Sequence, residues 1–268
     1  YDREGYVVIR GLLRPAELER LKAEMNRIVD AWPDDGEAAP GDAPETPLVA
    51  FDPAVVTGQL KVKTRADGVR RLFRMAVHDA FFARFAKDAR FVDFLARLWG
   101  PNVALLQSMA LMKPPKTGEK RFHQDQAYFR LAPSRVAAYW IAVDDADAEN
   151  GCIRYVPGSQ KERKLRPHRP LHEGREEGHA VVVDVAADEE IRLAEVPRGG
   201  VTLHDEWVVH GSPGNASPRH RRTYVIAFRT RAIVDAERAA GFTHSHNDDV
   251  NWDVFNPEIA AAAARTEL

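Results

Sequence analysis

Residues 199–222 read Gly-Gly-Val-Thr-Leu-His-Asp-Glu-Trp-Val-Val-His-Gly-Ser-Pro-Gly-Asn-Ala-Ser-Pro-Arg-His-Arg-Arg. The β-rich run 201–204 is typical of a strand, and the turn after it presents His210. Arg221 follows eleven residues later, at the start of another β-rich run, 223–229. A histidine presented at the end of a strand is a common metal ligand, and arginine is the usual partner of a carboxylate. This stretch therefore predicts a β fold that carries a binding site.

A second stretch, residues 121–129, reads Arg-Phe-His-Gln-Asp-Gln-Ala-Tyr-Phe and contains His123 and Asp125. If this stretch is extended, residues two apart face the same side, so the imidazole and the carboxylate converge. A His-x-Asp tripeptide alone is weak evidence, but a distal histidine completes the set that binds Fe(II) in non-haem oxygenases. Such a set leaves three metal positions open. If an organic dicarboxylate fills two of them, Arg221 is the natural partner for its far carboxylate.

The rest of the chain divides into a helical N-terminal part and a β-rich part. A strand is expected at 6–10, helices at 15–32 and 79–99, and a long surface loop at 33–58. Further strands are expected at 103–112, 136–143, 151–156, 180–185, 201–204 and 223–229. After about residue 231 the chain is polar, and it becomes helical again at 257–264. We therefore expect one domain, 1–268, with a β sandwich or barrel and N-terminal helices on one face.

Composition excludes several functional classes. The chain of 268 residues is 44% apolar and 29% charged with a formal net charge of −2, so it lacks the basic excess of a nucleic-acid-binding protein. Its apolar runs are too short for a membrane span. Cys152 is the single cysteine, which excludes an intrachain disulfide and a thiolate metal cluster. Because no signal-peptide pattern opens the chain either, the expected compartment is the cytoplasm. The oligomeric state is not predicted.

Motifs along most of the chain occur in the order of one known family. They are Glu-Gly-Tyr-Val-Val-Ile-Arg-Gly-Leu-Leu at 4–13, Gly-Pro-Asn-Val at 100–103, Met-Lys-Pro-Pro at 112–115, His-Gln-Asp at 123–125, Trp140, Asn-Gly-Cys at 150–152, Pro-Gly-Ser at 157–159, and His210 with Ser212, Asn215 and Arg221. Each motif alone is common, but together they are specific. The sequence resembles the phytanoyl-CoA dioxygenase family of Fe(II)- and 2-oxoglutarate-dependent oxygenases.

The resemblance implies a mainly β fold with N-terminal helices, namely a double-stranded β-helix, the cupin-like jelly roll. It implies Fe(II), 2-oxoglutarate and O2 as cofactors and co-substrates. The implied iron ligands are His123, Asp125 and His210, and Arg221 would bind the C5 carboxylate of 2-oxoglutarate. The other implied co-substrate contacts are Ser212, Trp140, Met109 and Lys61, with Lys63 an equally close candidate by spacing.

The implied reaction is hydroxylation of an unactivated C–H bond in a small molecule, with release of succinate and CO2. In this family the iron carries either a carboxylate ligand or a shorter residue that leaves room for a halide. Asp125 therefore predicts hydroxylation, or a desaturation or ring closure derived from it, and not halogenation. The substrate itself is not predicted, because the loops that would select it, 33–60, 161–179 and 231–250, carry no motif.

Several alternatives stay open. His204 is a rival metal ligand, although a place beside the ligands or the substrate fits it better. The stretch 161–179, with His168, His172 and His179, is either a solvated loop or a lid. Gln160 stands where the family often has histidine, which puts one supporting hydrogen bond in doubt. The chain could also be a non-redox cupin-like metalloenzyme, against which Arg221 and Trp140 argue. It could also be a jelly-roll binding protein without activity, against which the intact triad argues.

Overall fold

The computed structural model describes residues 1–32, 49–59, 61–100, 102–128, 135–170, 181–240 and 252–253. Its helices are α1 (Pro15–Ala31), α2 (Pro53–Val56), α3 (Met75–His78), α4 (Ala80–Ala86), α5 (Ala89–Trp99) and α6 (Arg231–Ala239), and shorter 3-10 helices lie at Arg65–Gly68, Asp125–Tyr128 and Ser159–Glu162. Its strands are β1 (Tyr6–Ile9), β2 (Val49–Phe51), β3 (Val69–Leu72), β4 (Val103–Lys113), β5 (Lys120–His123), β6 (Val136–Ala142), β7 (Ile153–Tyr155), β8 (Arg169–Pro170), β9 (Val181–Val182), β10 (Arg192–Ala194), β11 (Val201–Asp205), β12 (His210–Ser212), β13 (Arg221–Thr230) and β14 (Trp252–Asp253).

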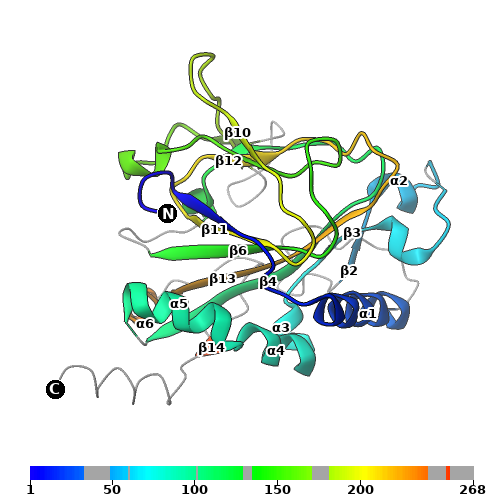
Figure 1. The fold of residues 1–268 in the computed structure, drawn as a ribbon, viewed down its shortest axis with the longest axis horizontal. Coiled ribbons are helices and arrows are strands. Elements are labelled where there is room, and N and C mark those ends of the chain that lie inside the picture. The colour runs from blue at the N-terminus through cyan, green and yellow to red at the C-terminus, as the bar shows by residue number, and fades with distance from the viewer. Residues whose placement is uncertain are drawn as a thin grey trace.

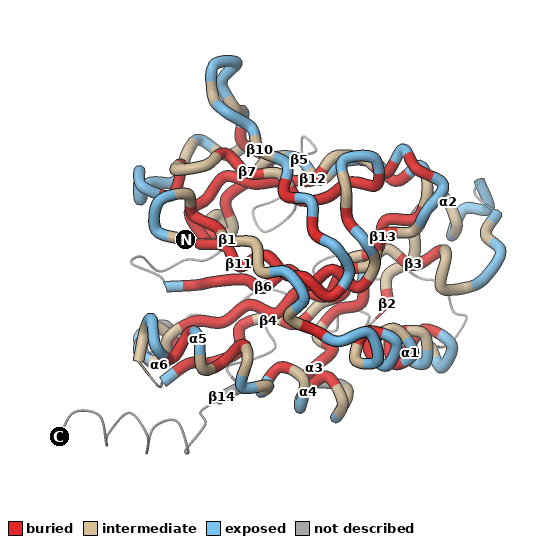
Figure 2. The backbone as a smooth tube through the Cα atoms, viewed as in Figure 1, coloured by how far each residue is buried: buried red, intermediate tan, exposed pale blue. Residues whose placement is uncertain are grey.

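The larger sheet has the strand order β1-β11-β6-β13-β4-β3-β2, with β14 paired to β4. At its centre β13 is antiparallel to both β4 and β6. Side chains alternate between the two faces of a strand. Tyr224, Ile226 and Phe228 accordingly join the core cluster that includes helical residues, while Val225 and Ala227 join the cluster shared with the smaller sheet. Both faces of this sheet are therefore buried (Figure 2).

The smaller sheet has the order β10-β7-β12-β5 and is layered over the inner face of the larger one (Figure 1). Ile153 and Tyr155 of β7 pack in the same cluster as Trp140 of β6 and Val225 of β13. These two facing antiparallel sheets form the expected sandwich, and its interior is the space in which a site can be built.

The N-terminal helices cover the outer face of the larger sheet, as expected (Figure 1). Leu18, Leu21 and Met25 of α1 belong to the same buried cluster as Phe82 of α4 and Phe91 of α5. The predicted helix 79–99, however, is two helices. The Asp88 carboxylate accepts a hydrogen bond from the backbone N–H of Arg90 and starts α5, just as Asp79 caps α4.

Other differences from the sequence predictions are local. The chain that follows β13 is helical in α6, where a polar tail was expected. The predicted loop 33–58 contains β2 and α2 in its described part. The predicted helix 257–264, residues 33–48, 171–180 and 241–251, and Pro101 and Phe129 lie outside the described residues. None of the described helices combines the length and the apolar character that crossing a bilayer requires.

Candidate metal centre

Pairing between β5 and β12 brings two histidines together. His123 is the last residue of β5 and His210 the first of β12, and the two are direct register partners. Their ring centroids are 4.3 Å apart. The approach to His210 is fixed by its neighbour, because the backbone N–H of Val209 donates to the Ser159 hydroxyl at 2.9 Å. Two strands of different sequence regions thus present both imidazoles to one point.

Each of the two rings is oriented by a backbone carbonyl. Nδ1 of His123 lies 3.0 Å from the Arg121 carbonyl oxygen, and Nδ1 of His210 lies 3.0 Å from that of Val208. Since a carbonyl only accepts, Nδ1 carries the hydrogen and Nε2 keeps its lone pair. Burial, followed by the charge of Lys120, lowers the pKa of His123; burial, followed by His123, lowers that of His210 well below its usual value. Both rings are therefore neutral and ready to bind a metal.

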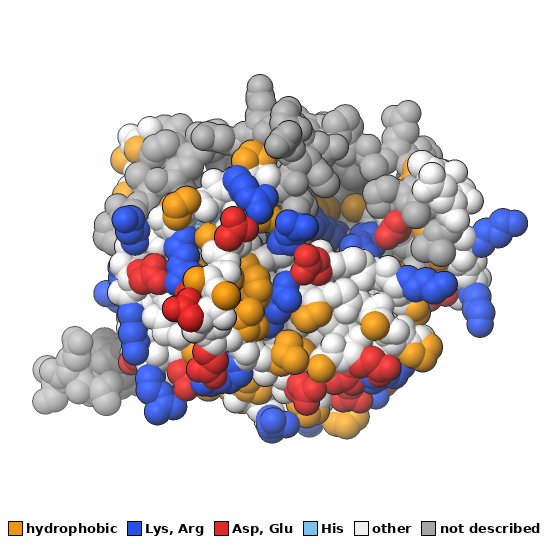
Figure 3. Space-filling model, turned by 90° about the horizontal axis from the view of Figure 1, so that it is seen from above, with side chains coloured by type: hydrophobic (Ala, Val, Ile, Leu, Met, Phe, Trp, Pro, Cys, Tyr) orange, Lys and Arg blue, Asp and Glu red, His pale blue; other side chains and the backbone are white. Residues whose placement is uncertain are grey.

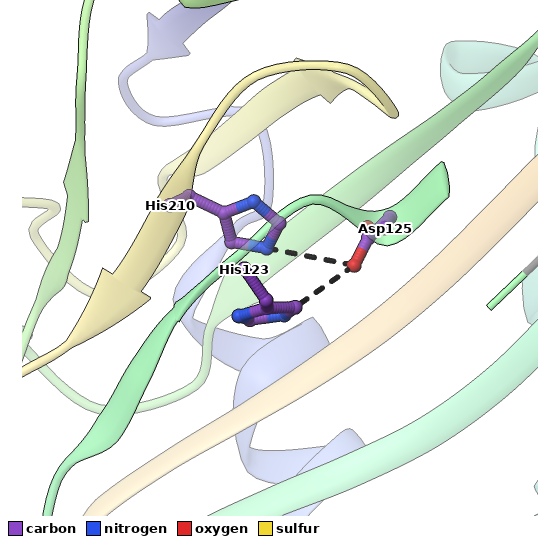
Figure 4. A group of neighbouring side chains, drawn as sticks. All are labelled: His123, Asp125 and His210. Atoms are coloured by element: carbon purple, nitrogen blue, oxygen red, sulfur yellow. Dashed lines mark ion pairs between the residues drawn. The ribbon is translucent and has the colours of Figure 1, made fainter. Parts of the chain in front are cut away.

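Asp125 supplies the third donor, but not from an extended strand. β5 ends at His123, and Asp125 begins the 3-10 helix Asp125–Tyr128, whose turn brings the carboxylate back toward the rings (Figure 4). Its Oδ1 lies 3.5 Å from Nε2 of His123 and 3.6 Å from Nε2 of His210. Burial raises the pKa of Asp125, but the electrostatic interactions with His210, His123 and His204 outweigh burial, so the pKa lies well below its usual value.

These donors fit a divalent metal. One atom from each of His123, Asp125 and His210 can be chosen so that all three lie within 4.8 Å of one another. Among the described residues it is the one group of three or more histidine, cysteine, aspartate or glutamate side chains placed this way. The imidazole side chains are 7% exposed and the carboxylate 24%, so the site opens on the Asp125 side. Two imidazoles and one carboxylate are the donor set preferred by Fe(II) with open positions.

Gln124 ties the segment 164–168 to this centre. The side chain is fully buried; its Nε2 donates to the carbonyls of Trp207 (2.8 Å) and Lys164 (3.1 Å), and its Oε1 accepts from the backbone N–H of Arg166 at 2.9 Å. Its own backbone N–H donates to Nε2 of His168 at 3.1 Å. His168 is thus bonded to the backbone between two of the site residues. His172 and His179 lie outside the described residues.

The first residue of β13 is a buried arginine. Arg221 is 2% exposed, and its guanidinium lies 5.3 Å from the Trp140 ring centroid. Nη1 donates to the Thr223 hydroxyl at 3.2 Å, but Nε is buried without a hydrogen-bond partner. Within the described parts of the chain no carboxylate forms an ion pair with Arg221. Burial lowers its pKa to about 9, so it is charged at neutral pH.

Lys113 of β4 is the cross-strand partner of Arg221. It is 6% exposed, and Nζ donates to the carbonyl oxygens of Ser212 (3.2 Å) and Pro213. Burial, followed by repulsion from Arg221, lowers its pKa to about 7. Two buried basic side chains without a carboxylate partner are costly unless an anion neutralises them. The charge of this buried pair therefore suits one carboxylate of a ligand.

The remaining predicted contacts fall into two groups. Met109 and Trp140 both pair with Val225 of β13, so they lie in one row across the larger sheet. Ser212 follows His210 on β12, and its hydroxyl donates to the Gly151 carbonyl at 2.8 Å. Lys61 and Lys63, by contrast, are exposed, and no described hydrogen bond or ion pair connects either to the triad.

Sequence reasoning missed Lys113 and the role of Gln160. Lys113 stood inside the Met-Lys-Pro-Pro motif, yet nothing in the sequence says that it points inward beside Arg221. Gln160 is buried, and its Nε2 donates to the Asp2 carbonyl at 2.9 Å, so it holds the N-terminal segment. His204 is not in the three-residue group; its Nε2 lies 3.4 Å from Oδ2 of Asp125.

Comparison with known proteins agrees with this geometry. The profile of the phytanoyl-CoA dioxygenase (PhyH) family matches residues 1–223. The zebrafish (Danio rerio) phytanoyl-CoA dioxygenase domain-containing protein 1 is 28% identical over 266 residues, covering 83% of this chain and 85% of that protein.

Solved structures share the fold. EctD from S. alaskensis with bound Fe superposes with a TM-score of 0.62 at 21% identity, over 85% of this chain and 74% of that one. EvdO2 from Micromonospora carbonacea var. aurantiaca, complexed with 2-oxoglutarate, gives 0.59 at 21% identity, over 85% and 87%. The predicted jelly roll is confirmed. The family match confirms the predicted enzyme class, a 2-oxoglutarate-dependent dioxygenase, with iron and 2-oxoglutarate as its cofactors. The chain belongs to the phytanoyl-CoA dioxygenase family.

Proposed function

We propose that residues 1–268 act as one dioxygenase domain that hydroxylates an unactivated C–H bond of a small molecule, converting 2-oxoglutarate and O2 to succinate and CO2. The observation that carries this proposal is the convergence of two neutral imidazoles and one carboxylate oxygen in the same sandwich as a buried arginine without a carboxylate partner. A redox metal and a dicarboxylate are the two components that such an arrangement accommodates.

The residues take distinct roles in this proposal. Nε2 of His123, Nε2 of His210 and Oδ1 of Asp125 would hold the metal, which when bound supplies the oxygen chemistry. Arg221, aided by Lys113, would bind the C5 carboxylate, because a guanidinium fork matches a carboxylate with two hydrogen bonds. Trp140 and Met109 would contact the co-substrate from the larger sheet, and Ser212 would contact it from β12 of the smaller sheet. A contact from Lys61 stays a prediction.

Two other functions use the same fold. A non-redox metalloenzyme, such as a hydrolase or isomerase, needs the triad but has no use for the buried basic side chains of Arg221 and Lys113. A binding protein without activity needs neither the complete triad nor both of these basic side chains. Succinate release separates the three, because only the dioxygenase forms succinate from 2-oxoglutarate in the presence of iron and oxygen.

The first test is metal binding and turnover. We expect the protein to bind about one Fe(II) per chain and to release succinate when 2-oxoglutarate and O2 are supplied. His210→Ala should lose both, since two of the three donors do not suffice. His220→Ala is the matched control, because His220 lies near the surface and pairs with Asp67 at 3.1 Å. Unchanged iron stoichiometry and full succinate release in His210→Ala would contradict the ligand assignment.

The second test concerns the product. Since the Asp125 carboxylate occupies one metal position, we expect a halide to find no place there. Substrate turned over with excess chloride under labelled O2 should carry a labelled hydroxyl, or a double bond or ring without label. A chlorinated product from the native chain would contradict the proposal.

The surface charges support a small-molecule substrate, and Cys152 supports a reducing compartment. Lys/Arg and Asp/Glu side chains are interspersed over the described part of the face in Figure 3, which suits a small-molecule substrate better than a nucleic acid. Cys152 is buried, and burial raises its thiol pKa to about 11, so it is unreactive. A reducing compartment such as the cytoplasm is part of the proposal, and fractionation of the native cells would test it.

A further inference from the structure

His204 lies against the side of Asp125 that the triad histidines do not approach. It is on β11 and is 3% exposed. Its Nε2 is 3.4 Å from Oδ2 of Asp125, whereas Nε2 of His123 and of His210 both approach Oδ1. The two oxygens of one carboxylate therefore face different partners.

Tyr155 contacts the edge of the His204 ring that faces away from Asp125. The Tyr155 hydroxyl is fully buried, 3.1 Å from Nδ1 of His204 and 2.8 Å from the Thr202 hydroxyl oxygen. The Tyr6 ring stacks on the Tyr155 ring at 4.0 Å and holds it in place. A carboxylate only accepts, so the contact between Nε2 of His204 and Oδ2 of Asp125 is a hydrogen bond that Nε2 donates. The Tyr155 hydroxyl itself donates to the Thr202 hydroxyl oxygen.

We propose that His204 is a positioning residue that engages Oδ2 of Asp125 and thereby keeps Asp125 a one-oxygen metal ligand. The inference rests on the metal site of the proposed function. A carboxylate that bound through both oxygens would take a fourth metal position and leave two. Chelation of 2-oxoglutarate and binding of O2 together need three. The chain Thr202–Tyr155–His204–Asp125 thus decides how open the metal is.

His204 as a fourth metal ligand is the competing arrangement, because its ring centroid is only 4.6 Å from that of His210. Two features of the geometry favour the positioning role. Its Nε2 lies 3.4 Å from Oδ2 of Asp125, the oxygen that His123 and His210 do not approach, and not from the oxygen shared by the triad. Its Nδ1, the nitrogen left to bind a metal, faces the Tyr155 hydroxyl, away from the triad.

The test compares two amides of matched polarity at position 204. In His204→Gln the amide nitrogen reaches the place of the imidazole Nε2 and can donate to Asp125. In His204→Asn the side chain is one methylene shorter and reaches only the place of Nδ1. We expect the Asn variant to bind Co(II), and then 2-oxoglutarate, about 10- to 100-fold more weakly than the native chain in anaerobic calorimetry, and the Gln variant to recover most of the loss. Tyr155→Phe keeps the stacked ring but removes the hydroxyl that contacts His204, so we expect a smaller weakening of about two- to tenfold.

Each outcome of these experiments either supports or overturns the positioning role of His204. Native-like affinities in the Asn variant, or equal losses in Asn and Gln, would overturn the positioning role. So would pulsed EPR of the vanadyl-loaded native chain that counts three imidazole ligands in place of the expected two. If the Asn variant does not fold, Tyr155→Phe with the imidazole count still decides. Failure of the native chain to bind any metal would instead refute the proposed function, so the two failures are distinguishable.

Discussion

At the scale of single residues, Lys113 is the group whose charge depends most on its ligand. It is buried beside Arg221, and its pKa of about 7 means that roughly half is deprotonated at neutral pH. A carboxylate bound nearby would raise that pKa, so binding takes up a proton. We expect the affinity for 2-oxoglutarate to be highest below about pH 7 and to fall as the pH rises toward about pH 9. Lys113→Met should bind more weakly and lose this pH dependence, as calorimetry across that range would show.

Arg221→Met and Lys116→Met are the variants with which Lys113→Met should be compared. Leaving a buried carboxylate without its charge partner costs on the order of 3–5 kcal/mol, which predicts a loss of about two orders of magnitude or more in 2-oxoglutarate affinity for Arg221→Met, with metal binding kept. Lys116 is exposed on the turn after β4, so its variant should behave as the native chain does. An affinity that is flat with pH in the native chain would contradict the role given to Lys113.

The sequence predicted individual donors better than their partners. The grouping of His123, Asp125 and His210 could be predicted because candidate metal ligands are particular residue types in a recognisable order. Lys113 and the contact of His204 with Asp125 could not, since both depend on which face of a strand points inward and on a register between distant strands. The expected strand geometry around Asp125 was wrong for the same reason: a 3-10 turn, and not alternation along a strand, brings the carboxylate to the rings.

At the scale of elements, the contact between β5 and β12 sets the distance between the two histidines. Gly211 lies where this pairing shifts register, and a Cβ added there would come within 2.8 Å of the Lys120 carbonyl oxygen and 3.2 Å of the Arg121 carbonyl. Backbone atoms cannot rotate away, so Gly211→Ala should push the strands apart. We expect metal affinity to fall at least tenfold and the free energy of unfolding to drop by about 1–3 kcal/mol.

Gly118→Ala is the matched control for that variant. Gly118 lies on the exposed turn between β4 and β5, and an added Cβ meets no atom within 4 Å. Its metal affinity, measured by the same titration, should equal that of the native chain. A Gly211→Ala protein that folds and binds metal as tightly as the Gly118 variant would show that strand spacing does not control the site.

Short elements were the hardest to predict. β5 has four residues and β12 three, too few for an alternating pattern to stand out, although together they carry the two histidines of the triad. The long strands β4 and β13 were predicted closely because ten or more residues give a clear signal. The break between α4 and α5 was missed because the apolar periodicity continues through it, whereas the Asp88 cap that starts α5 is a matter of one hydrogen bond.

At the scale of the whole molecule, the fold buries the carboxyl groups of Asp205 and Glu206, and this burial should make the free energy of unfolding depend on pH. Glu206 follows β11 and is 2% exposed; burial, followed by repulsion from Asp205, raises its pKa to about 8. Asp205 is buried as well, and Arg163 approaches both carboxylates, at 3.3 Å from Asp205 and 3.9 Å from Glu206. The arginine side chain is 59% exposed, so it compensates the pair only in part.

The sign of the pH effect follows from that raised pKa. An unfolded glutamate releases its proton near pH 4.5, but folded Glu206 holds it to about pH 8, so the folded state binds more protons between these values. The contribution of this group to stability is therefore complete below about pH 4.5, and it falls by a few kcal/mol as the pH rises to about 8.

Glu206→Gln tests this effect. The variant keeps an oxygen that can accept from the Val136 N–H, which donates to Glu206 at 3.2 Å, but it has no charge to bury. Urea unfolding at about pH 5 and about pH 8 should show a smaller difference for this variant than for the native chain, while Asp188→Asn, which removes an exposed carboxylate, should leave that difference unchanged. If Glu206→Gln lost as much stability between the two pH values as the native chain, Glu206 would have to be ionised in the folded protein throughout, paired more strongly with Arg163 than its geometry indicates.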